Sequence, residues 1–188
     1  MKYLIALCVV LLSVATFHAQ AVTNDVLKKR IAAAHAEDSI ALTTAGGTTK
    51  LMAVTENFSK EDSERSGILA MTLAIGVMYP GDSLAKSPDS FLLTFWVLSK
   101  KPRFGANHSM VVTLKEEILV IGSAKYAAKP REQMEYLNFE ISRINLAKIA
   151  AESDVRLKLG DREFTFTPSQ MKLFADFLVV TDAGTGEQ

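Results

Sequence analysis

The stretch VRLKLGDREFTFTPSQMKLFADFLV, at residues 155–179, decides the fold class of this chain. Its first half alternates apolar and polar residues in two short runs, Val155–Leu159 and Glu163–Thr167, and such alternation is typical of half-buried strands. Gly160-Asp161 lies between the runs. A two-residue link of this kind indicates a type II′ hairpin turn, because glycine accepts a positive φ. The first half therefore predicts an antiparallel hairpin.

The second half of the same stretch predicts a helix. Thr167-Pro168-Ser169-Gln170 carries a threonine for the N-cap, a proline at the first helical position and a glutamine at the third, which together form a capping box. The helix is expected to run to about Val179, with Phe174, Phe177 and Leu178 packed on a sheet.

Strand patterns also outnumber helix patterns in the rest of the chain, and the links between neighbouring strands are short. These features favour an antiparallel sheet over a parallel one. The predicted fold class is therefore α+β, with an N-terminal helix, a short helix and a C-terminal helix packed on a mainly antiparallel sheet. Further strands are expected at Lys50–Phe58, Phe91–Leu98, Met110–Leu114, Ile118–Tyr126 and Met134–Ile141. Further helices are expected at Asn24–Glu37 and Leu146–Ala151, with a loop or short helical turn at Ser59–Ser66 and a break at Thr43–Thr49.

Two of the strand segments carry more specific expectations. In Met134–Ile141 the alternation places Glu135, Leu137, Phe139 and Ile141 on the core side. Ile68–Tyr79 is apolar almost throughout. Its length and the glycine within it favour a strand buried on both faces, and a buried helix stays open as the alternative.

The first residues are expected to leave the protein on export. Met1-Lys2 gives a positive start, Leu4–Val14 is an apolar run, and Ala19-Gln20-Ala21 matches a cleavage site. A membrane anchor is the alternative, but eleven helical residues span only about 16 Å, whereas a hydrocarbon core is about 30 Å thick. We therefore expect a signal peptide at 1–21 and a single exported α+β domain at 22–188, whose residues 182–188 form a polar tail.

The cysteine content points to a compartment. The single cysteine, Cys8, lies inside the apolar run, so the mature domain is expected to contain no disulfide and no thiolate ligand. A disulfide-free exported domain fits bacterial export better than animal secretion. The expected location is the periplasm or the extracellular space.

The charge balance excludes some classes of partner. Lys and Arg together number 21, as do Asp and Glu, so the net charge is zero. That balance excludes a polybasic nucleic-acid binder and an acidic disordered chain. The sequence predicts no cofactor and no metal site, and it identifies neither a protein partner nor an oligomeric state.

One motif suggests chemistry. Gly81-Asp82-Ser83-Leu84 resembles the nucleophile block of the GDSL esterase/lipase family. The resemblance implies that Ser83 attacks an ester carbonyl and that its own backbone N–H helps to hold the oxyanion. The family's base is the histidine of a D-x-x-H block, which does not occur in this chain, and its G-x-N-D block is matched in part at Gly105–His108. His108 is then the candidate base. The other reading of the motif is a turn between two strands.

The remaining polar residues favour structural interpretations. His35 and His108 lack a carboxylate or histidine at ligand spacing and are interpreted as surface histidines. The acidic pairs Glu61-Asp62 and Glu116-Glu117 are interpreted as solvated connections, and the basic cluster Lys100–Phe104 as an exposed loop.

A second resemblance concerns the end of the chain. The hydrophobic pattern of Asn145–Val180 is similar to the end of several uncharacterised bacterial exported domains, and it assigns no functional residue. The sequence therefore predicts an exported, non-enzymatic domain that binds a protein partner or supports an envelope assembly. Two alternatives stay open. One is a GDSL-type serine esterase using Ser83, and the other is a carrier whose segment Ile68–Tyr79 lines a cavity for a small apolar ligand.

Overall fold

The computed structural model describes residues 21–184, and its largest element is a six-stranded sheet in the order β2-β3-β4-β6-β10-β9. The strands are β2 (Ile40–Ala45), β3 (Thr48–Asn57), β4 (Ala70–Pro80), β6 (Ser90–Leu98), β9 (Lys125–Lys129) and β10 (Met134–Ser142). The expected signal peptide, apart from Ala21, lies outside the described residues together with Cys8, and so does the end of the polar tail.

The other elements form two smaller sheets and the helices. A four-stranded sheet has the order β12-β11-β7-β8, and β1 pairs with β5. Their bounds are β1 (Val22–Thr23), β5 (Ser83–Leu84), β7 (Ser109–Thr113), β8 (Ile118–Ser123), β11 (Arg156–Leu159) and β12 (Arg162–Thr165). The helices are α1 (Asn24–Ala33), α2 (Lys60–Arg65), α3 (Arg143–Ala151), α4 (Pro168–Val180) and the 3₁₀ helix η1 (Pro130–Glu132). Antiparallel sheets combined with helices agree with an α+β class, although the chain is mostly β and forms several sheets.

The stretch at residues 155–179 folds as its pattern predicts. Gly160 has φ +59° in the link between β11 and β12. Thr167 caps α4: its hydroxyl accepts from the Gln170 backbone N–H at 3.2 Å, and the Gln170 side chain accepts from the Thr167 N–H at 3.0 Å. The predicted core face of β10 is also confirmed, since Glu135, Leu137, Phe139 and Ile141 are all buried.

The N-terminal helix is shorter than predicted. The hydroxyl of Thr23 caps it by accepting from the Val26 N–H. The helix ends at Ala33, because His35 adopts φ +50°, a left-handed conformation that no helix continues. The prediction that the helix reaches Glu37 was therefore wrong. Helix α3, in contrast, is longer than predicted, because it begins at Arg143 instead of Leu146.

The expected break at Thr43–Thr49 is a hairpin. Gly46 and Gly47 have φ +58° and +73° and connect β2 to β3 in register. Two consecutive positive φ values match a type I′ turn, whose twist suits the flanking strands. The threonines therefore belong to strands, and β2 is an element that the sequence pattern did not predict.

The expected strand at Ile118–Tyr126 is two strands in different sheets. The chain leaves the four-stranded sheet after Ser123 and enters the six-stranded sheet at Lys125. Ala124 lies at the crossing, where its N–H donates to the His108 carbonyl at 2.9 Å. One continuous segment thus joins the two sheets.

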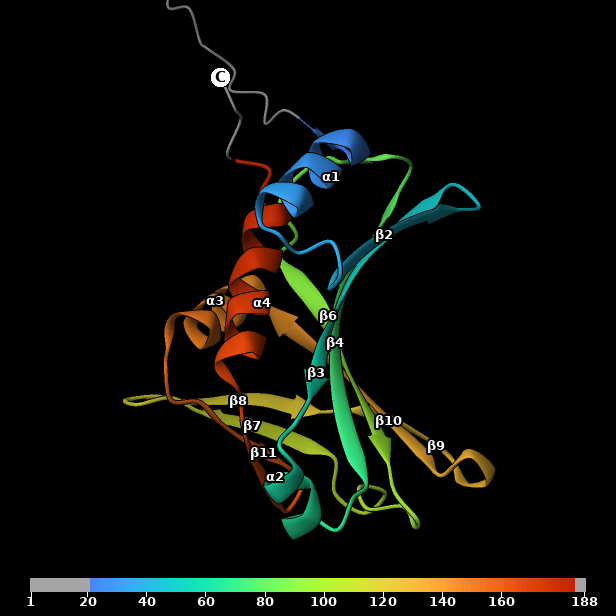
Figure 1. Ribbon diagram of the computed structural model, residues 1–188, viewed down its shortest axis with the longest axis vertical. Coiled ribbons are helices and arrows are strands. Elements are labelled where there is room, and N and C mark those ends of the chain that lie inside the picture. The colour runs from blue at the N-terminus through green and yellow to red at the C-terminus, as the bar shows by residue number, and fades with distance from the viewer. Residues whose placement is uncertain (1–20, 185–188) are drawn as a thin grey trace, which may run out of the picture.

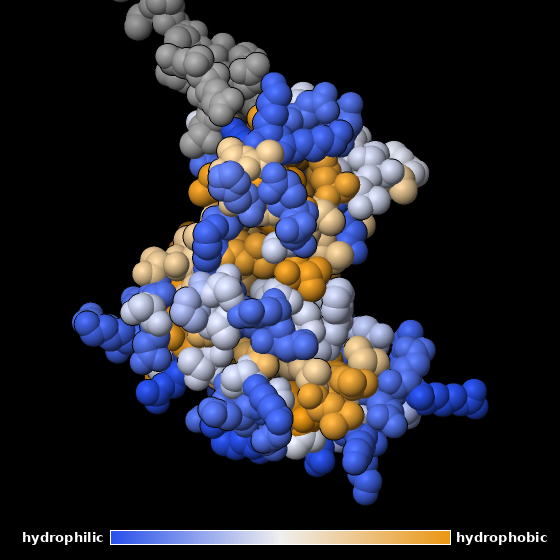
Figure 2. Space-filling view, viewed as in Figure 1, coloured by the Kyte–Doolittle hydropathy of each residue, from blue (hydrophilic) through white to orange (hydrophobic). Residues whose placement is uncertain are grey.

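Figure 1 shows α1, α3, α4 and the four-stranded sheet on one side of the six-stranded sheet, while the described residues leave its other side open. Segment 68–79 shows the consequence. It forms most of β4, as predicted, but it is not buried on both faces. Met71, Leu73 and Ile75 are fully buried, whereas Met78 is 66% exposed. In the space-filling view of Figure 2, hydrophilic side chains cover α1 and α2, and hydrophobic residues show between the helices and the sheet.

The buried residues form a single connected cluster that spans both larger sheets. Phe58, which follows β3, lies at its centre. Its ring centroid is 6.3 Å from that of Phe95 in β6, 5.5 Å from that of Phe164 in β12 and 5.6 Å from that of Phe166. Aromatic pairs at these distances add to the stabilisation from burial alone.

Both ends of the described chain lie beside α1. The Arg30 guanidinium of α1 donates to the carbonyls of Val180 and Asp182, and the Ala183 N–H donates to the Ser87 hydroxyl. No helix within residues 21–184 combines the length and the apolarity needed to cross a membrane.

Candidate functional site

The open face of the six-stranded sheet follows from strand alternation. Leu73, Phe95 and Leu137 pair across β4, β6 and β10, and all three are fully buried on the helix side. The next residues along these strands point to the other face. That face is hollowed: Figure 2 shows the concave profile between the β2–β3 hairpin and the β9 end of the sheet.

Two small residues in β4 form the floor of this hollow. Gly76 pairs with Met52 on one side and Leu92 on the other, so a position without a side chain lies between two long ones. Ala74 is the next residue of β4 on the same face. Glycine inside a strand often marks a place where another group approaches the backbone closely. The resulting groove has a volume of about 570 Å³, within the range of small-molecule sites.

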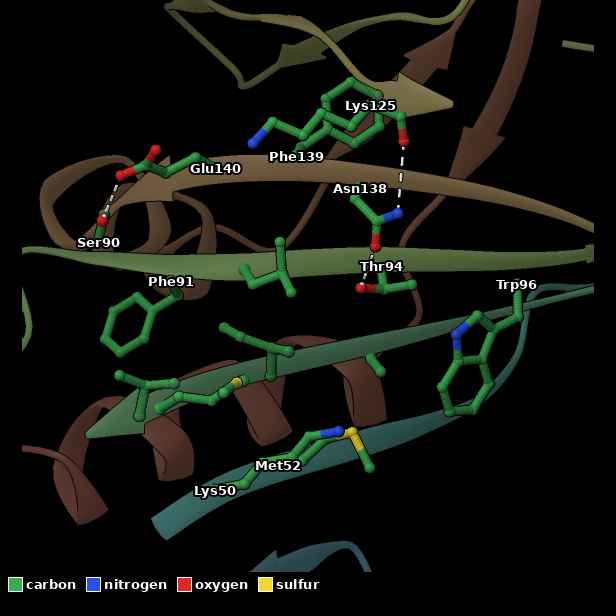
Figure 3. A pocket seen from close by; sticks show the side chains of 16 residues that line it. Lys50, Met52, Ser90, Phe91, Thr94, Trp96, Lys125, Asn138, Phe139 and Glu140 are labelled. Atoms are coloured by element: carbon green, nitrogen blue, oxygen red, sulfur yellow. Dashed lines mark hydrogen bonds between the residues drawn. The ribbon is translucent and has the colours of Figure 1, made fainter. Parts of the chain in front are cut away.

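Apolar side chains form the walls of the groove. Met52, Met78, Leu92 and Trp96 line it, and Leu92 is 49% exposed. Figure 3 shows Lys50 and Met52 on one side of the groove, Lys125, Asn138 and Glu140 on the other, and Trp96 towards one end. Trp96 is the only tryptophan of the chain.

The hydroxyl and carboxamide groups and the one carboxylate of the groove already have partners. The Thr94 hydroxyl donates to the Asn138 carbonyl oxygen at 2.8 Å, and the Asn138 amide donates to the Lys125 backbone carbonyl at 3.3 Å. The Ser90 hydroxyl donates to Glu140 Oε1 at 2.6 Å. These groups therefore need no ligand to satisfy them, and the groove offers mainly apolar surface.

The two lysines of the groove differ from these groups. Within the described residues, neither the Lys50 nor the Lys125 ammonium makes a hydrogen bond or an ion pair. Lys50 also borders a second hollow of about 370 Å³, which continues the groove over β2. Met52, Met78 and Lys50 are common to both hollows.

The structure does not bring Ser83 and His108 together. Ser83 lies in β5 opposite Thr23, beside the N-terminus of α1. His108 precedes β7, and its ring stacks on Tyr126 of β9 at a centroid distance of 5.6 Å. The Pro80–Ser83 segment forms a turn between β4 and β5. Its Gly81 has φ +73°, and the Gly81 carbonyl accepts from the Thr49 hydroxyl at 2.5 Å.

The other candidate residues lie apart from the groove, either exposed or in contacts that stabilise the fold. His35 is exposed after α1. Glu117 pairs with Lys148 at 2.6 Å. Asp62 is buried rather than solvated, because it accepts from the Arg65 side chain and from the Thr165 backbone N–H. Within residues 21–184, no group of three or more histidines, cysteines and acids is arranged to hold a metal ion.

The end of the basic cluster Lys100–Phe104, which was expected to be an exposed loop, contributes to a buried carboxylate site. Phe104 is fully buried, and the backbone N–H groups of Arg103 and Phe104 donate to Glu135 at 2.8 and 2.9 Å. Glu135 also accepts from the Ser99 and Tyr126 hydroxyls at 3.1 and 3.0 Å. Burial, together with this carboxylate, raises the pKa of Tyr126 to about 12. The sequence signal was an acidic residue at a core position of β10.

Comparison of the chain with known protein families, with curated proteins and with solved structures found no match.

Proposed function

We propose that residues 22–188 form an exported, non-enzymatic binding domain, and that its ligand is a small apolar molecule held in the groove on the open face of the six-stranded sheet. The observation that carries the proposal is the floor at Gly76 and Ala74, which leaves a hollow between larger apolar side chains. A mostly apolar hollow with few polar groups is the usual form of a small-molecule site.

A bulky side chain at position 76 would close the floor. A Cβ atom placed on Gly76 would lie 3.2 Å from the Leu51 carbonyl oxygen, which is closer than most such contacts. The strand therefore passes its neighbour tightly at this point, so a larger side chain here would strain the sheet as well as fill the hollow. When a ligand covers exposed apolar surface of this kind, the removal of that surface from water contributes about 25 cal/mol of favourable free energy per Å².

The esterase alternative has less support. Ser83 and His108 belong to different sheets or their flanking loops, and within the described residues Ser83 makes no side-chain hydrogen bond to a base. A serine without a positioned base is a weak nucleophile.

Trp96 allows a direct test of ligand binding. The mature chain is titrated with dodecanol, a neutral apolar probe, below its solubility limit while the emission of Trp96 is followed. Because Trp96 lines the groove, a saturable change in its emission is expected when the probe binds. The absence of any change with dodecanol and with charged dodecyl compounds would contradict the proposal.

Two matched substitutions locate the binding. Leu92→Glu places a charge on the apolar wall and is expected to weaken dodecanol binding about tenfold, because the carboxylate resists desolvation. Val120→Glu is the control: Val120 is also a strand residue, 74% exposed, but it lies in β8 of the other sheet. Equal weakening by both substitutions would show that the probe does not occupy the groove.

Export is tested separately. The proposal rests on the sequence of residues 1–21, and expression of the full chain in a bacterium should yield an exported protein whose first residue is Val22. Mass spectrometry of the intact exported protein measures this. A retained N-terminal segment would contradict it.

A further inference from the structure

We propose that the ligand of the groove carries an anionic group that the Lys50 ammonium binds, while the apolar body of the ligand lies over Gly76 and Ala74 towards Trp96. This inference rests on the proposed function and adds the chemical class of the ligand, which is a single-chain amphiphile with a negatively charged end.

The charges of the groove support an anion. Its charged lining residues are Lys50, Lys125 and Glu140, so the cations outnumber the carboxylate. Glu140 already accepts from Ser90. The charge of the whole chain is balanced, so the excess of positive charge is a local property of this face.

The position of Glu140 distinguishes the two lysines. Lys125 pairs with Asn138 of β10, and Glu140 is two residues further along the same face of that strand. Such diagonal neighbours lie about 7 to 8 Å apart, within reach of long side chains. Lys125 therefore shares its end of the groove with a carboxylate.

Among residues 21–184, no acidic residue pairs with Lys50 or lies diagonal to it on the two neighbouring strands. Lys50 pairs with Thr43 of β2 and with Met78 of β4. It is also the only charged residue among those that line the adjoining hollow, where the other residues are Ala41, Thr43, Ala45, Thr48, Met52 and Met78. An anion at Lys50 thus meets a cation without a competing carboxylate.

The register of the strands gives the length of the ligand. Met78, opposite Lys50, and Thr72, opposite Trp96, are six residues apart on β4, which corresponds to about 20 Å of strand. Gly76 and Ala74 lie between them on the same face. A ligand that reaches from Lys50 to Trp96 is therefore long and narrow, as an alkyl chain is.

The test compares dodecyl compounds that differ in the head group. Dodecanoate, dodecyl phosphate, dodecanol and dodecyltrimethylammonium are titrated below their micellar concentrations, with Trp96 emission as the readout. Both anions are expected to bind two- to fivefold more tightly than dodecanol, which is the range for an exposed ion pair. The trimethylammonium compound should bind least well. The preference for anions should shrink at high salt, because salt screens exposed charges.

Neutral substitutions assign the contact to Lys50. Lys50→Gln should remove the two- to fivefold preference for dodecanoate over dodecanol, measured as the ratio of the two affinities in the same variant. Lys125→Gln should change the preference less than Lys50→Gln. Lys158→Gln, an exposed lysine of β11 in the other sheet, is the control.

The outcomes separate the two proposals. If none of the dodecyl compounds changes the Trp96 emission, the proposed function fails and this inference fails with it. If the compounds bind with equal affinity whatever their charge, the binding function stands and the anionic class is wrong. A larger effect of Lys125→Gln than of Lys50→Gln would overturn the assignment to Lys50.

Discussion

Glu135 is a charged residue in the core, and its carboxylate organises the chain that follows β6. It is 1% exposed and accepts from two backbone N–H groups and two hydroxyls. Charge-assisted hydrogen bonds are stronger than neutral ones. The Glu135 side chain thus ties the loop that begins at Ser99 to β10.

Replacing this carboxylate should destabilise the protein. Glu135→Gln turns one acceptor oxygen into a donor and leaves buried N–H groups unsatisfied, so the free energy of unfolding should fall by about 2 to 4 kcal/mol. Urea unfolding followed by circular dichroism measures the change. Glu163→Gln, at an exposed position of β12, should stay within about 0.5 kcal/mol of the wild type. Equal effects of the two substitutions would contradict the role given to Glu135.

For single residues, the sequence predicted which side chains are buried better than it predicted their hydrogen-bond partners. Alternation in β10 placed Glu135 in the core together with Leu137. The backbone donors to its carboxylate, however, are the N–H groups of Arg103 and Phe104, which are about thirty residues away in the chain. No local pattern encodes that contact, because it depends on how the loop after β6 returns to the sheet.

Helix α4 shows how far local signals determine an element. Its capping box satisfies two backbone N–H groups, those of Thr167 and Gln170. The same cap is tied to β3, because the Thr167 hydroxyl donates to Glu56 at 2.9 Å. Hydrogen bonds from the Ser169 and Thr167 hydroxyls hold the pKa of Glu56 below its ordinary value.

Removing the cap tests this element. Thr167→Ala should lower the free energy of unfolding by about 1 to 2 kcal/mol, and Thr167→Ser should restore most of it. Thermal or urea unfolding gives the comparison. Ser153→Ala, at an exposed loop position, is the control and should change stability little. A Thr167→Ala protein as stable as the wild type would show that the cap contributes nothing.

The same scale shows where sequence patterns stop being informative. Strands with strong β-branched and aromatic content, such as β6, were predicted close to their bounds. The Gly46-Gly47 pair predicts a break and hides the short β2, although in the structure the pair closes a hairpin. The split between β8 and β9 has one local sign, Gly122, whose φ is +118° and where the pairing of β8 with β7 shifts register. A single glycine inside a strand pattern indicates a bulge rather than a change of sheet.

For the whole molecule, the sequence predicted antiparallel pairing without showing which strands share a sheet. That choice depends on contacts between distant residues, such as Phe58 with Phe164. The candidate site likewise depends on contacts between residues that are distant in the chain. Gly76 and Trp96 form one groove only because β4 and β6 are neighbours, and the sequence had suggested an interior cavity rather than an open face.

Alkaline pH should weaken the molecule at two separate points. Burial and the charge of Asp82 raise the pKa of Tyr79 to about 12, and Tyr126 is raised to about 12 as well. The ordinary value of a tyrosine is 10.0, so above that pH the unfolded chain releases protons that the folded protein keeps. This contribution to stability is complete below pH 10.0 and is lost as the pH rises towards about 12.

Urea unfolding at a series of pH values measures this loss. A Tyr79→Phe/Tyr126→Phe double variant should be less stable at neutral pH, because two hydroxyl hydrogen bonds are missing, but its stability should fall less between pH 10 and 12. Lysines also titrate in this pH range, but they do so in both proteins. If the free energy of unfolding fell equally with pH in the wild type and the double variant, the loss of stability would not come from Tyr79 and Tyr126.

The placement of the chain ends beside α1 has a practical consequence. A fusion partner, an affinity tag or a sensor-chip linkage joined at either end of the described chain enters at the α1 end of the molecule. The concave sheet face then stays accessible to solution. Immobilised protein can therefore be assayed with the same ligands as free protein, and either orientation of a fusion suits such work.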